Sequence, residues 1–426
     1  MAEQGKTVTF TAKPDAQFAV DAWSISGGTF KTGGTAGSST ATVDVTAAVT
    51  VKVKFKYTGD TLELESQAFT KGKTDTFTYT LVKAGSGSYT AEPENPAVIS
   101  VTINNDAGEA TVQCLDLGSS RIKVKDVLSG EDAYSGVITV PEGAFLTLSA
   151  DKKDIKVKAK TADGSPVTVT GCTVTTLASG TETTLNAKDT VVILEGNITE
   201  LELNDNQLTA LNVQGCAALQ SLICTGNQLA SLNLQDLTAL KTLRCSGNQL
   251  TALNVKGCTA LYILECHFNQ LSSLNVQGCN GLKMLACHYN QLTELNVEGC
   301  TALKMLACFH NQLTSLNVQG FADLQLLLCN NNQLTELNAQ GFSALKELDC
   351  SGNQLNAEAM TKILNALPER EAGKNGECYL YIDSAGESNH NYIGSPEALK
   401  TAFDAAKARH WAIYKWKLDG AKEGVF

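Results

Sequence analysis

A repeat of fixed length constrains this sequence more than any other feature. The tripeptide Asn-Gln-Leu recurs eight times at intervals of 21 residues, without insertion or deletion: Asn206, Asn227, Asn248, Asn269, Asn290, Asn311, Asn332 and Asn353. A fixed period of this size predicts a stack of one supersecondary unit, in which each turn of the chain contacts only its neighbours. Residues 198–355 are therefore expected to form a solenoid.

Within one unit, Leu222 and Cys224 alternate with Ser221, Ile223 and Thr225, which is the period-2 pattern of a strand with one buried face. Like residues stack on parallel strands about 4.8 Å apart. Burying each leucine contributes about 1.5–3 kcal/mol. The asparagine that follows each strand is predicted to point inward and to satisfy backbone groups at the turn. A second apolar run, at Leu232 and Leu234 in this unit, is predicted to close the coil on the opposite side.

One full unit reads Leu219-x-x-Leu222-x-Cys224-x-x-Asn227-x-Leu229-x-x-Leu232-x-Leu234. It resembles the leucine-rich repeat, with cysteine in the third leucine position, and in particular the internalin-like surface proteins of bacteria such as gut and oral anaerobes. The resemblance implies a parallel, concave β-sheet. It also implies a role in binding or adhesion at a cell surface.

The cysteines follow the repeat. Of the 14 in the chain, seven form one ladder and four form a second, where Leu237, Phe321 and Phe342 stand in other units. Exchange with leucine and phenylalanine indicates that these thiols are small core hydrophobes. A zinc or iron–sulfur array is the alternative, but the sequence has no Cys-x-x-Cys pair. Cys114, Cys172 and Cys378 lie outside both ladders. Reduced thiols fit a cytosol or an anaerobic habitat.

The segments before the solenoid are predicted to be all-β. Residues 1–57 alternate in short runs and resemble a divergent internalin B-repeat. Residues 58–142 carry about seven short β runs, which predicts a small sandwich; the stretch from Gly118 to Asp126 resembles a bacterial Ig-like domain. Residues 143–197 alternate again and run into the first repeat, where a solenoid needs a cap over its apolar end.

After the last repeat the pattern changes to α/β. Asn356 is an expected N-cap for a helix over 357–367 that ends before Pro368. A strand over 379–382, a second helix from Ser395 to about 409 with Pro396 at its first position, and a strand over 411–418 follow. The predicted fold is therefore multidomain: two β modules (1–57 and 58–142), a β-rich cap (143–197), eight leucine-rich repeats (198–355) and an α/β C-terminal cap (356–426).

Composition excludes several classes of protein. A formal net charge of −11 argues against a nucleic-acid binder, which would carry a basic face. No apolar stretch is long enough to span a membrane. Met1 opens into a strand-like pattern without a signal peptide, so either the protein is cytosolic or this chain begins after a removed export signal. The resemblance favours a cell-surface or secreted protein.

The candidate site lies where the repeat departs from its own consensus. Outward positions on the strands are small or charged in the outer repeats, but large and apolar or aromatic in the middle ones. Apolar patches of this kind mark binding surfaces, and interfaces are enriched in aromatic residues and methionine. The predicted concave-face ligand site comprises Tyr262, Ile263, Glu265, His267, Phe268, Met284, His288, Tyr289, Met305, Phe309, His310, Leu326 and Leu328.

The histidines allow a narrower hypothesis. His267 and His288 are one repeat apart, with Cβ atoms expected about 5 Å from one another. They could hold a transition metal with Glu265 nearby, or titrate together as a pH-sensitive contact, but contact with a ligand is favoured. We predict no cofactor and no catalytic residue, because no nucleophile elbow, phosphate loop or paired metal motif occurs.

Two classes of function follow. The first is a cell-surface or secreted adhesion protein whose concave face binds a protein, peptide or glycan. The second is a structural or assembly component that uses the same patch for self-association or for contact with another subunit. Nucleic acid is not an expected partner of either.

Overall fold

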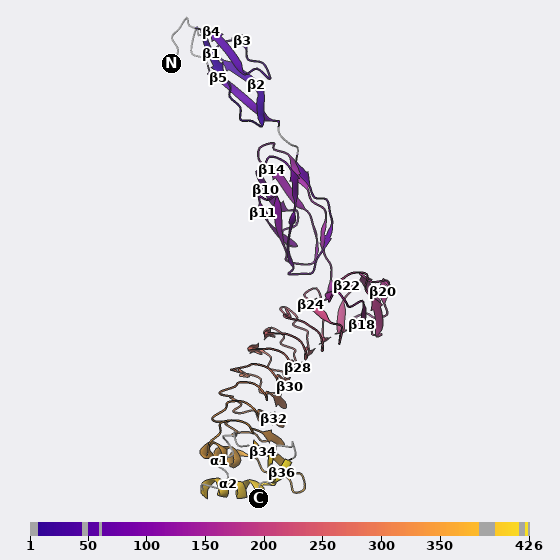
Figure 1. The fold of residues 1–426 in the computed structure, drawn as a ribbon, viewed down its shortest axis with the longest axis vertical. Coiled ribbons are helices and arrows are strands. Elements are labelled where there is room, and N and C mark those ends of the chain that lie inside the picture. Colours follow the sequence, from indigo (N-terminus) through magenta and orange to yellow (C-terminus); the bar gives the residue numbers. More distant parts are fainter. Residues whose placement is uncertain (1–6, 45–49, 59–61, 383–396, 417–421, 425–426) are drawn as a thin grey trace. The chain divides into compact units, whose positions relative to one another are not determined.

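The computed structural model describes residues 7–44, 50–58, 62–382, 397–416 and 422–424, which form two compact units, residues 1–141 and 142–426 (Figure 1). The first unit is entirely β among its described residues. Its first five strands are β1 (Thr7–Thr11), β2 (Phe18–Ser26), β3 (Phe30–Gly33), β4 (Thr40–Asp44) and β5 (Thr50–Tyr57). They form one sheet in the order β1-β4-β3 and an antiparallel pair of β2 with β5.

The rest of the first unit consists of short strands in four small sheets. They are β6 (Glu63–Leu64), β7 (Phe69–Thr70), β8 (Thr76–Thr80), β9 (Val82–Ala84), β10 (Tyr89–Pro93), β11 (Ile99–Asn104), β12 (Glu109–Cys114), β13 (Gly118–Ser120), β14 (Ile122–Asp126), β15 (Asp132–Tyr134) and β16 (Ile138–Val140). These strands are shorter and more numerous than the seven runs predicted from the sequence. They enclose a separate apolar core around Ile99, Val112, Ile122 and Ile138.

The second unit begins with a β-rich segment: β17 (Gly143–Leu148), β18 (Asp154–Thr161), β19 (Val167–Thr170), β20 (Thr176–Leu177), β21 (Thr183–Asn186) and β22 (Val191–Glu195). Two of these strands continue into the solenoid. β18 pairs antiparallel with β23 (Ile198–Glu202), the first repeat strand, and β17 pairs with β24 (Leu208–Asn212) on the other side of the coil. Both apolar layers of the first repeat are thereby covered.

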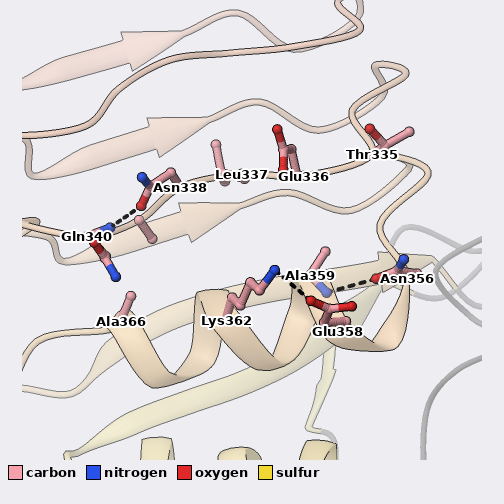
Figure 2. A pocket seen from close by; sticks show the side chains of 11 residues that line it. Thr335, Glu336, Leu337, Asn338, Gln340, Asn356, Glu358, Ala359, Lys362 and Ala366 are labelled. Carbon is pink, nitrogen blue, oxygen red and sulfur yellow. Dashed lines mark hydrogen bonds and ion pairs between the residues drawn. The ribbon is translucent and has the colours of Figure 1, made fainter.

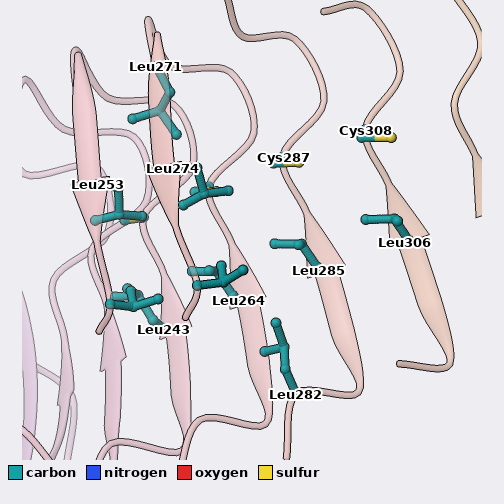
Figure 3. Packing of buried hydrophobic residues seen from close by; sticks show 14 of the residues in the cluster. Leu243, Leu253, Leu264, Leu271, Leu274, Leu282, Leu285, Cys287, Leu306 and Cys308 are labelled. Atoms are coloured by element: carbon teal, nitrogen blue, oxygen red, sulfur yellow. The ribbon is translucent and has the colours of Figure 1, made fainter. Parts of the chain in front are cut away.

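The predicted solenoid of leucine-rich repeats is present. Its strands after β23 are β25 (Ser221–Ile223), β26 (Thr242–Arg244), β28 (Ile263–Glu265), β30 (Met284–Ala286), β31 (Met305–Ala307), β32 (Leu326–Leu328) and β33 (Glu347–Asp349). They pair in parallel with a register shift of 21 residues at every step, so Leu285 lies between Leu264 and Leu306 (Figure 3). On the opposite side of the coil, the described repeats after β24 form regular strands at β27 (Ala252–Asn254) and β29 (Ser273–Asn275).

The inward asparagines do what the sequence predicts. Oδ1 of Asn290 accepts a hydrogen bond from the Leu271 backbone N–H at 2.9 Å, and its Nδ2 donates to the carbonyls of Cys266 and Cys287. The same pattern recurs in the neighbouring repeats. Each asparagine therefore ties two successive turns of the coil together. Leucine would leave these buried backbone groups unpaired.

All fourteen cysteines lie in the described part of the chain, and each is a buried free thiol. Cys287 and Cys308 stack one repeat apart beneath the sheet, as Figure 3 shows. Burial raises the pKa of the Cys224 and Cys287 thiols to about 12, so these groups are protonated at neutral pH. Their role is to fill space in the core.

The chain after the last repeat is α/β: α1 (Ala357–Ala366), β34 (Gly376–Ile382), α2 (Glu397–Ala408), β35 (Trp411–Trp416) and β36 (Lys422–Gly424). Asn356 is the N-cap of α1, because its side chain accepts from the Ala359 N–H at 2.8 Å. β34 and β35 extend the repeat sheet in parallel. The guanidinium of Arg409 donates to the carbonyls of Leu364, Asn365 and Leu367 at the C-terminal end of α1.

Two sequence expectations fall partly outside the described residues: the start of the second helix at Ser395 and Pro396, and the end of the last strand at residues 417–418. Among the described residues, no helix is long and apolar enough to cross a membrane.

Candidate functional site

The candidate site lies on the outward face of the parallel sheet, across β28, β30, β31 and β32. Along the first outward position of these strands, Ile263, Met284, Met305 and Leu326 are in register and half-buried. They form an apolar ladder on a surface where the outer repeats place Thr242 and Glu347.

The second outward position is less exposed than the sequence pattern predicts. Glu265 and Leu328 are half-buried, but Ala286 and Ala307, which lie between them, are buried. Ser246, Asp349 and Ser351, also expected to face outward in other repeats, are buried as well. These side chains are short, so larger side chains on the same face of the sheet cover them. Glu265 pairs with Arg244, Oε1 to Nη2, at 3.5 Å.

Six aromatic side chains follow the ends of the strands, and we call them the ring array. His267, His288 and Phe309 form an inner column, with ring centroids 4.3 and 4.2 Å apart and interplanar angles of 8° and 13°. Phe268, Tyr289 and His310 form an outer column with spacings of 4.6 and 4.4 Å and angles of 8° and 11°. These separations are close to the spacing of the strands that carry the rings.

The two columns lie side by side because of the backbone between them. Adjacent strand residues normally point to opposite faces. Here the outer-column residues adopt left-handed conformations, with φ of 52° for Phe268, 52° for Tyr289 and 50° for His310. The chain therefore turns, and both members of each pair stay on one face. Their rings meet edge to face, with centroids 5.5 Å apart for His267 and Phe268.

The same backbone conformation recurs at the equivalent position of every repeat, immediately before the ladder asparagine. Its other occupants are suited to positive φ: Asp205, Gly226, Gly247, Asn331 and Gly352. Bulky residues in this region cost about 1–2 kcal/mol each. The rings of the outer column thus replace glycine, aspartate and asparagine at a position that disfavours them.

The ring array is accessible to a ligand. Phe268 is 55% exposed and Tyr289 is 41% exposed, while the inner column is half-buried. Tyr262, at the other end of the strand, is 45% exposed and carries the ammonium of Lys283 4.8 Å from its ring centroid. All thirteen predicted site residues therefore retain exposed surface. The apolar ladder lies at one end of the strands and the ring array at the other, with the buried Ala286 and Ala307 between them.

A polar side chain lies at one end of each column, which the sequence did not predict. Ser246 Oγ lies 3.0 Å from Nδ1 of His267 at one end of the inner column. Asn331 Nδ2 lies 3.4 Å from Nε2 of His310 at one end of the outer column. The sequence did contain a signal for the left-handed backbone of the outer column. In the other repeats the residue before the ladder asparagine is glycine, aspartate or asparagine, and these residue types are suited to positive φ.

The histidines are held in their neutral form. Burial, followed by the charges of His267 and His310, lowers the pKa of His288 to about 4. Burial also lowers the pKa values of His267 and His310. The Nδ1 atom of His288 is buried and has no hydrogen-bond partner among the described residues. A charged imidazolium between two rings would be poorly solvated, so the stacks depend on neutral rings.

The stacking also bears on the metal hypothesis. Nitrogen lone pairs lie in the ring planes, and the planes of His267 and His288 are nearly parallel. The two rings therefore do not direct their nitrogens at one point. Among the described residues, no group of three or more His, Cys, Asp or Glu side chains is placed to hold a metal ion.

Other hollows lie outside the ring array. One is formed by the last repeat and α1; Figure 2 shows Asn338, Asn356 and the Glu358–Lys362 ion pair at its wall. Another lies on the opposite side of the coil, around Asn254, Asn275 and Asn296. A third lies beside β18 and β23. The first two are lined by ordinary turn and helix residues and contain no concentration of aromatic side chains.

Comparison with known proteins gives partial matches. The functional domain of InlJ from Listeria monocytogenes, which includes a cysteine ladder, is 29% identical over 46% of this chain and 43% of that chain, with a TM-score of 0.39. YopM, a leucine-rich effector protein from Yersinia pestis, is 26% identical over 40% of this chain and 49% of that chain, with a TM-score of 0.34. The matches span less than half the length of both solved chains. No protein-family model and no curated protein matches the sequence.

Proposed function

We propose that this chain is a cell-surface or secreted binding protein, without catalytic activity, and that the ring array is the centre of its contact with a protein ligand. The observation that carries the proposal is the outer column. Three bulky side chains occupy left-handed positions where other repeats place glycine, aspartate or asparagine. The solenoid core does not require them, since the outer repeats fold around the same ladders without them.

Face-to-face stacking within the outer column offsets part of this cost, and edge-to-face contacts with the inner column offset more. Each stacked ring pair contributes about 0.5–1.5 kcal/mol, and the outer column contains two such pairs. Three left-handed bulky residues cost about 3–6 kcal/mol in total. Backbone strain of this kind concentrates at functional sites. The strained backbone and the stacking hold the rings in place before a ligand arrives. Rings that are already fixed lose little entropy when a ligand binds, which favours binding.

The orientation of the rings favours a protein over a glycan. Sugars stack on the faces of aromatic rings, but in both columns the faces between neighbouring rings are covered, which leaves only the faces at the column ends. Apart from those end faces, the array exposes mainly ring edges, and Met284, Met305 and Leu326 lie farther along the same repeats. Aromatic and methionine-rich surfaces of this composition are typical of protein–protein interfaces. The sequence resemblance to bacterial surface leucine-rich repeat proteins supports the same class and the extracellular location.

The test is a binding screen against extracellular-matrix proteins and glycan arrays with the wild type and a variant that lacks the rings. The variant combines Phe268→Gly, Tyr289→Gly and Phe309→Ala, because glycine suits the outer backbone positions. A matched control changes three exposed threonines outside the ring array to alanine, namely Thr251, Thr293 and Thr314. We expect a protein hit that the ring variant loses and the control keeps, with both variants retaining the wild-type circular dichroism spectrum.

Other results would decide against the proposal. A hit on glycans alone that depends on the rings would replace the protein ligand with a sugar. Concentration-dependent dimerisation that buries Phe268 and Tyr289, measured by multi-angle light scattering, would favour the assembly role instead. A protein ligand bound equally by wild type and ring variant would place the site elsewhere.

A further inference from the structure

The outer column has one end without a side chain against it. At its other end, Asn331 meets His310. At the near end, the next residue in the same column position is Gly247. A Cβ atom placed at Gly247 would meet only the backbone of Gly226, at 3.5 Å, and no side-chain atom within 4 Å. The face of Phe268 that looks along the solenoid towards Gly247 is therefore open, in keeping with its 55% exposure.

The following position in the column carries a negative charge. The carboxylate of Asp205 lies over Gly226, so close that Gly226 has no room for a Cβ atom. Asp205 forms no ion pair among the described residues. Three successive positions of the column are therefore occupied by the Asp205 carboxylate over Gly226, by open space over Gly247, and by the ring of Phe268. At about 4.8 Å per repeat, the carboxylate and the ring are separated by roughly two repeat steps. That interval accommodates one planar group.

The surface beyond Asp205 is also acidic. A hollow beside β18 and β23 is lined by four carboxylate residues, Asp154, Glu182, Glu202 and Asp205, but only two lysines, Lys152 and Lys156. The nearest cation on the strand that leads to Gly247 is Arg244, and it is paired with Glu265. The chain as a whole has a net charge of −11. Positive charge on a ligand is therefore attracted to this end of the ring array.

We propose that the space over Gly247 binds a cationic side chain of the protein ligand, arginine in preference to lysine, with the cation between the ring of Phe268 and the carboxylate of Asp205. An aromatic face attracts a cation within about 6 Å of its centroid. The flat guanidinium continues the stack of rings and directs N–H donors at the carboxylate, which a lysine ammonium does less well. The partner is a basic segment. This assignment rests on the proposed function of the ring array.

The test uses the full chain and a fluorescein-labelled hexa-arginine peptide, with binding measured by fluorescence anisotropy at physiological salt. Asp205→Asn removes the charge and keeps a residue suited to positive φ. Its matched control is Asp236→Asn, which makes the same change of net charge at another positive-φ position, away from the column. Gly247→Asn fills the open space, and Gly278→Asn, at an unobstructed turn glycine, is its control.

We expect Gly247→Asn, which excludes both the cation–π contact and the ion pair, to weaken hexa-arginine binding by about tenfold, and Asp205→Asn, which removes the ion pair alone, to weaken it by about threefold. The two control variants should bind like the wild type. Hexa-lysine should bind more weakly than hexa-arginine. Equal weakening by Asp205→Asn and Asp236→Asn would mean that only net charge matters, and would overturn the assignment.

The failure of this inference is distinguishable from the failure of the proposed function. If the ring variant loses a protein ligand that Asp205→Asn and Gly247→Asn still bind normally, the ring array is the binding site and the cation position is wrong. If Asp205→Asn and Gly247→Asn weaken hexa-arginine binding, but the screen finds only glycans whose binding depends on the rings, the cation site over Gly247 is correct and the proposed protein ligand is wrong. A thermal melt of each variant checks that it is folded. Asparagine should be tolerated at this column position, because Asn331 occupies it in another repeat.

Discussion

The left-handed backbone of the outer column makes a sharp prediction about stability: at Tyr289, glycine should be tolerated better than alanine. Either substitution removes two stacked contacts, with Phe268 at 4.6 Å and His310 at 4.4 Å, and two edge contacts, with His288 and Phe309, worth about 2–6 kcal/mol together. Alanine keeps the left-handed penalty of about 1–2 kcal/mol. Glycine is free of that penalty but loses about 0.5–1 kcal/mol in backbone entropy. Tyr289→Gly should therefore be more stable than Tyr289→Ala by about 0.5–1 kcal/mol.

The measurement is equilibrium unfolding in urea, followed by far-UV circular dichroism, with midpoints compared between variants of the same full chain. Met305 supplies the control because it lies on strand β31, where the backbone is ordinary. There the order should reverse, with Met305→Gly less stable than Met305→Ala by about 0.5–1 kcal/mol. The opposite signs at the two sites cancel any general effect of glycine on the unfolded chain.

Two outcomes would refute the reasoning. If Tyr289→Ala is as stable as Tyr289→Gly while the Met305 pair behaves as expected, the outer column carries no backbone strain, and strain is no guide to its function. If both Tyr289 variants lose more than about 6 kcal/mol, the loss exceeds what the four ring contacts contribute. The ring would then be part of the core, and its assignment to an exposed surface would be wrong.

Three further predictions concern the repeats. The pKa of His288 is lowered from 6.5 to about 4, so the stability it supports is present above pH 6.5 and lost as pH falls towards 4; His288→Phe should flatten the dependence of the urea midpoint on pH in that window. Asn290→Ala should cost at least about 3 kcal/mol, because it leaves the Leu271 N–H and two carbonyls unpaired, whereas Asn254→Ala, at the exposed end of β27, should cost about 1 kcal/mol or less in the same unfolding assay. A thiol reagent at pH 8 should leave Cys287 unlabelled in the native protein and label it in denaturant, as mass spectrometry would show; rapid native labelling would contradict its burial.

The sequence predicts the solenoid well because its period fixes the register. Once Leu264, Leu285 and Leu306 are known to stack, every strand pair between them follows by arithmetic, and the structure has that pairing. The asparagine ladder was predictable for a similar reason. A polar residue repeated at a buried position must find partners in the backbone of the adjacent turn. By contrast, the short strands of residues 62–140 have no such periodic constraint, and their number was underestimated.

The sequence also located the exposed residues of the middle repeats but not their geometry. Strict alternation along a strand would place His288 on the concave face and Tyr289 on the opposite one. Only the left-handed backbone at Tyr289 brings both rings to one face and creates two columns. The sequence did not predict a role for Asp205 or Gly247, because both residue types are ordinary at this repeat position. Their importance lies in what stands next to them in the stack, which no single repeat reveals.

A solenoid makes it possible to recognise a functional departure within a single sequence. In a globular core, each residue has its own environment, and there is no reference for what a position would hold if it had no function. Here Gly226 and Gly352 occupy the same backbone conformation as Phe268 and Tyr289. They show what the position favours when nothing else is demanded of it. Because each repeat contacts only its neighbours, strain in the middle repeats stays local and the ladders beneath remain intact. The chain can therefore hold a strained aromatic surface on a scaffold whose ladders do not depend on it, which is why we propose a ligand, and not the fold, as the reason for the rings.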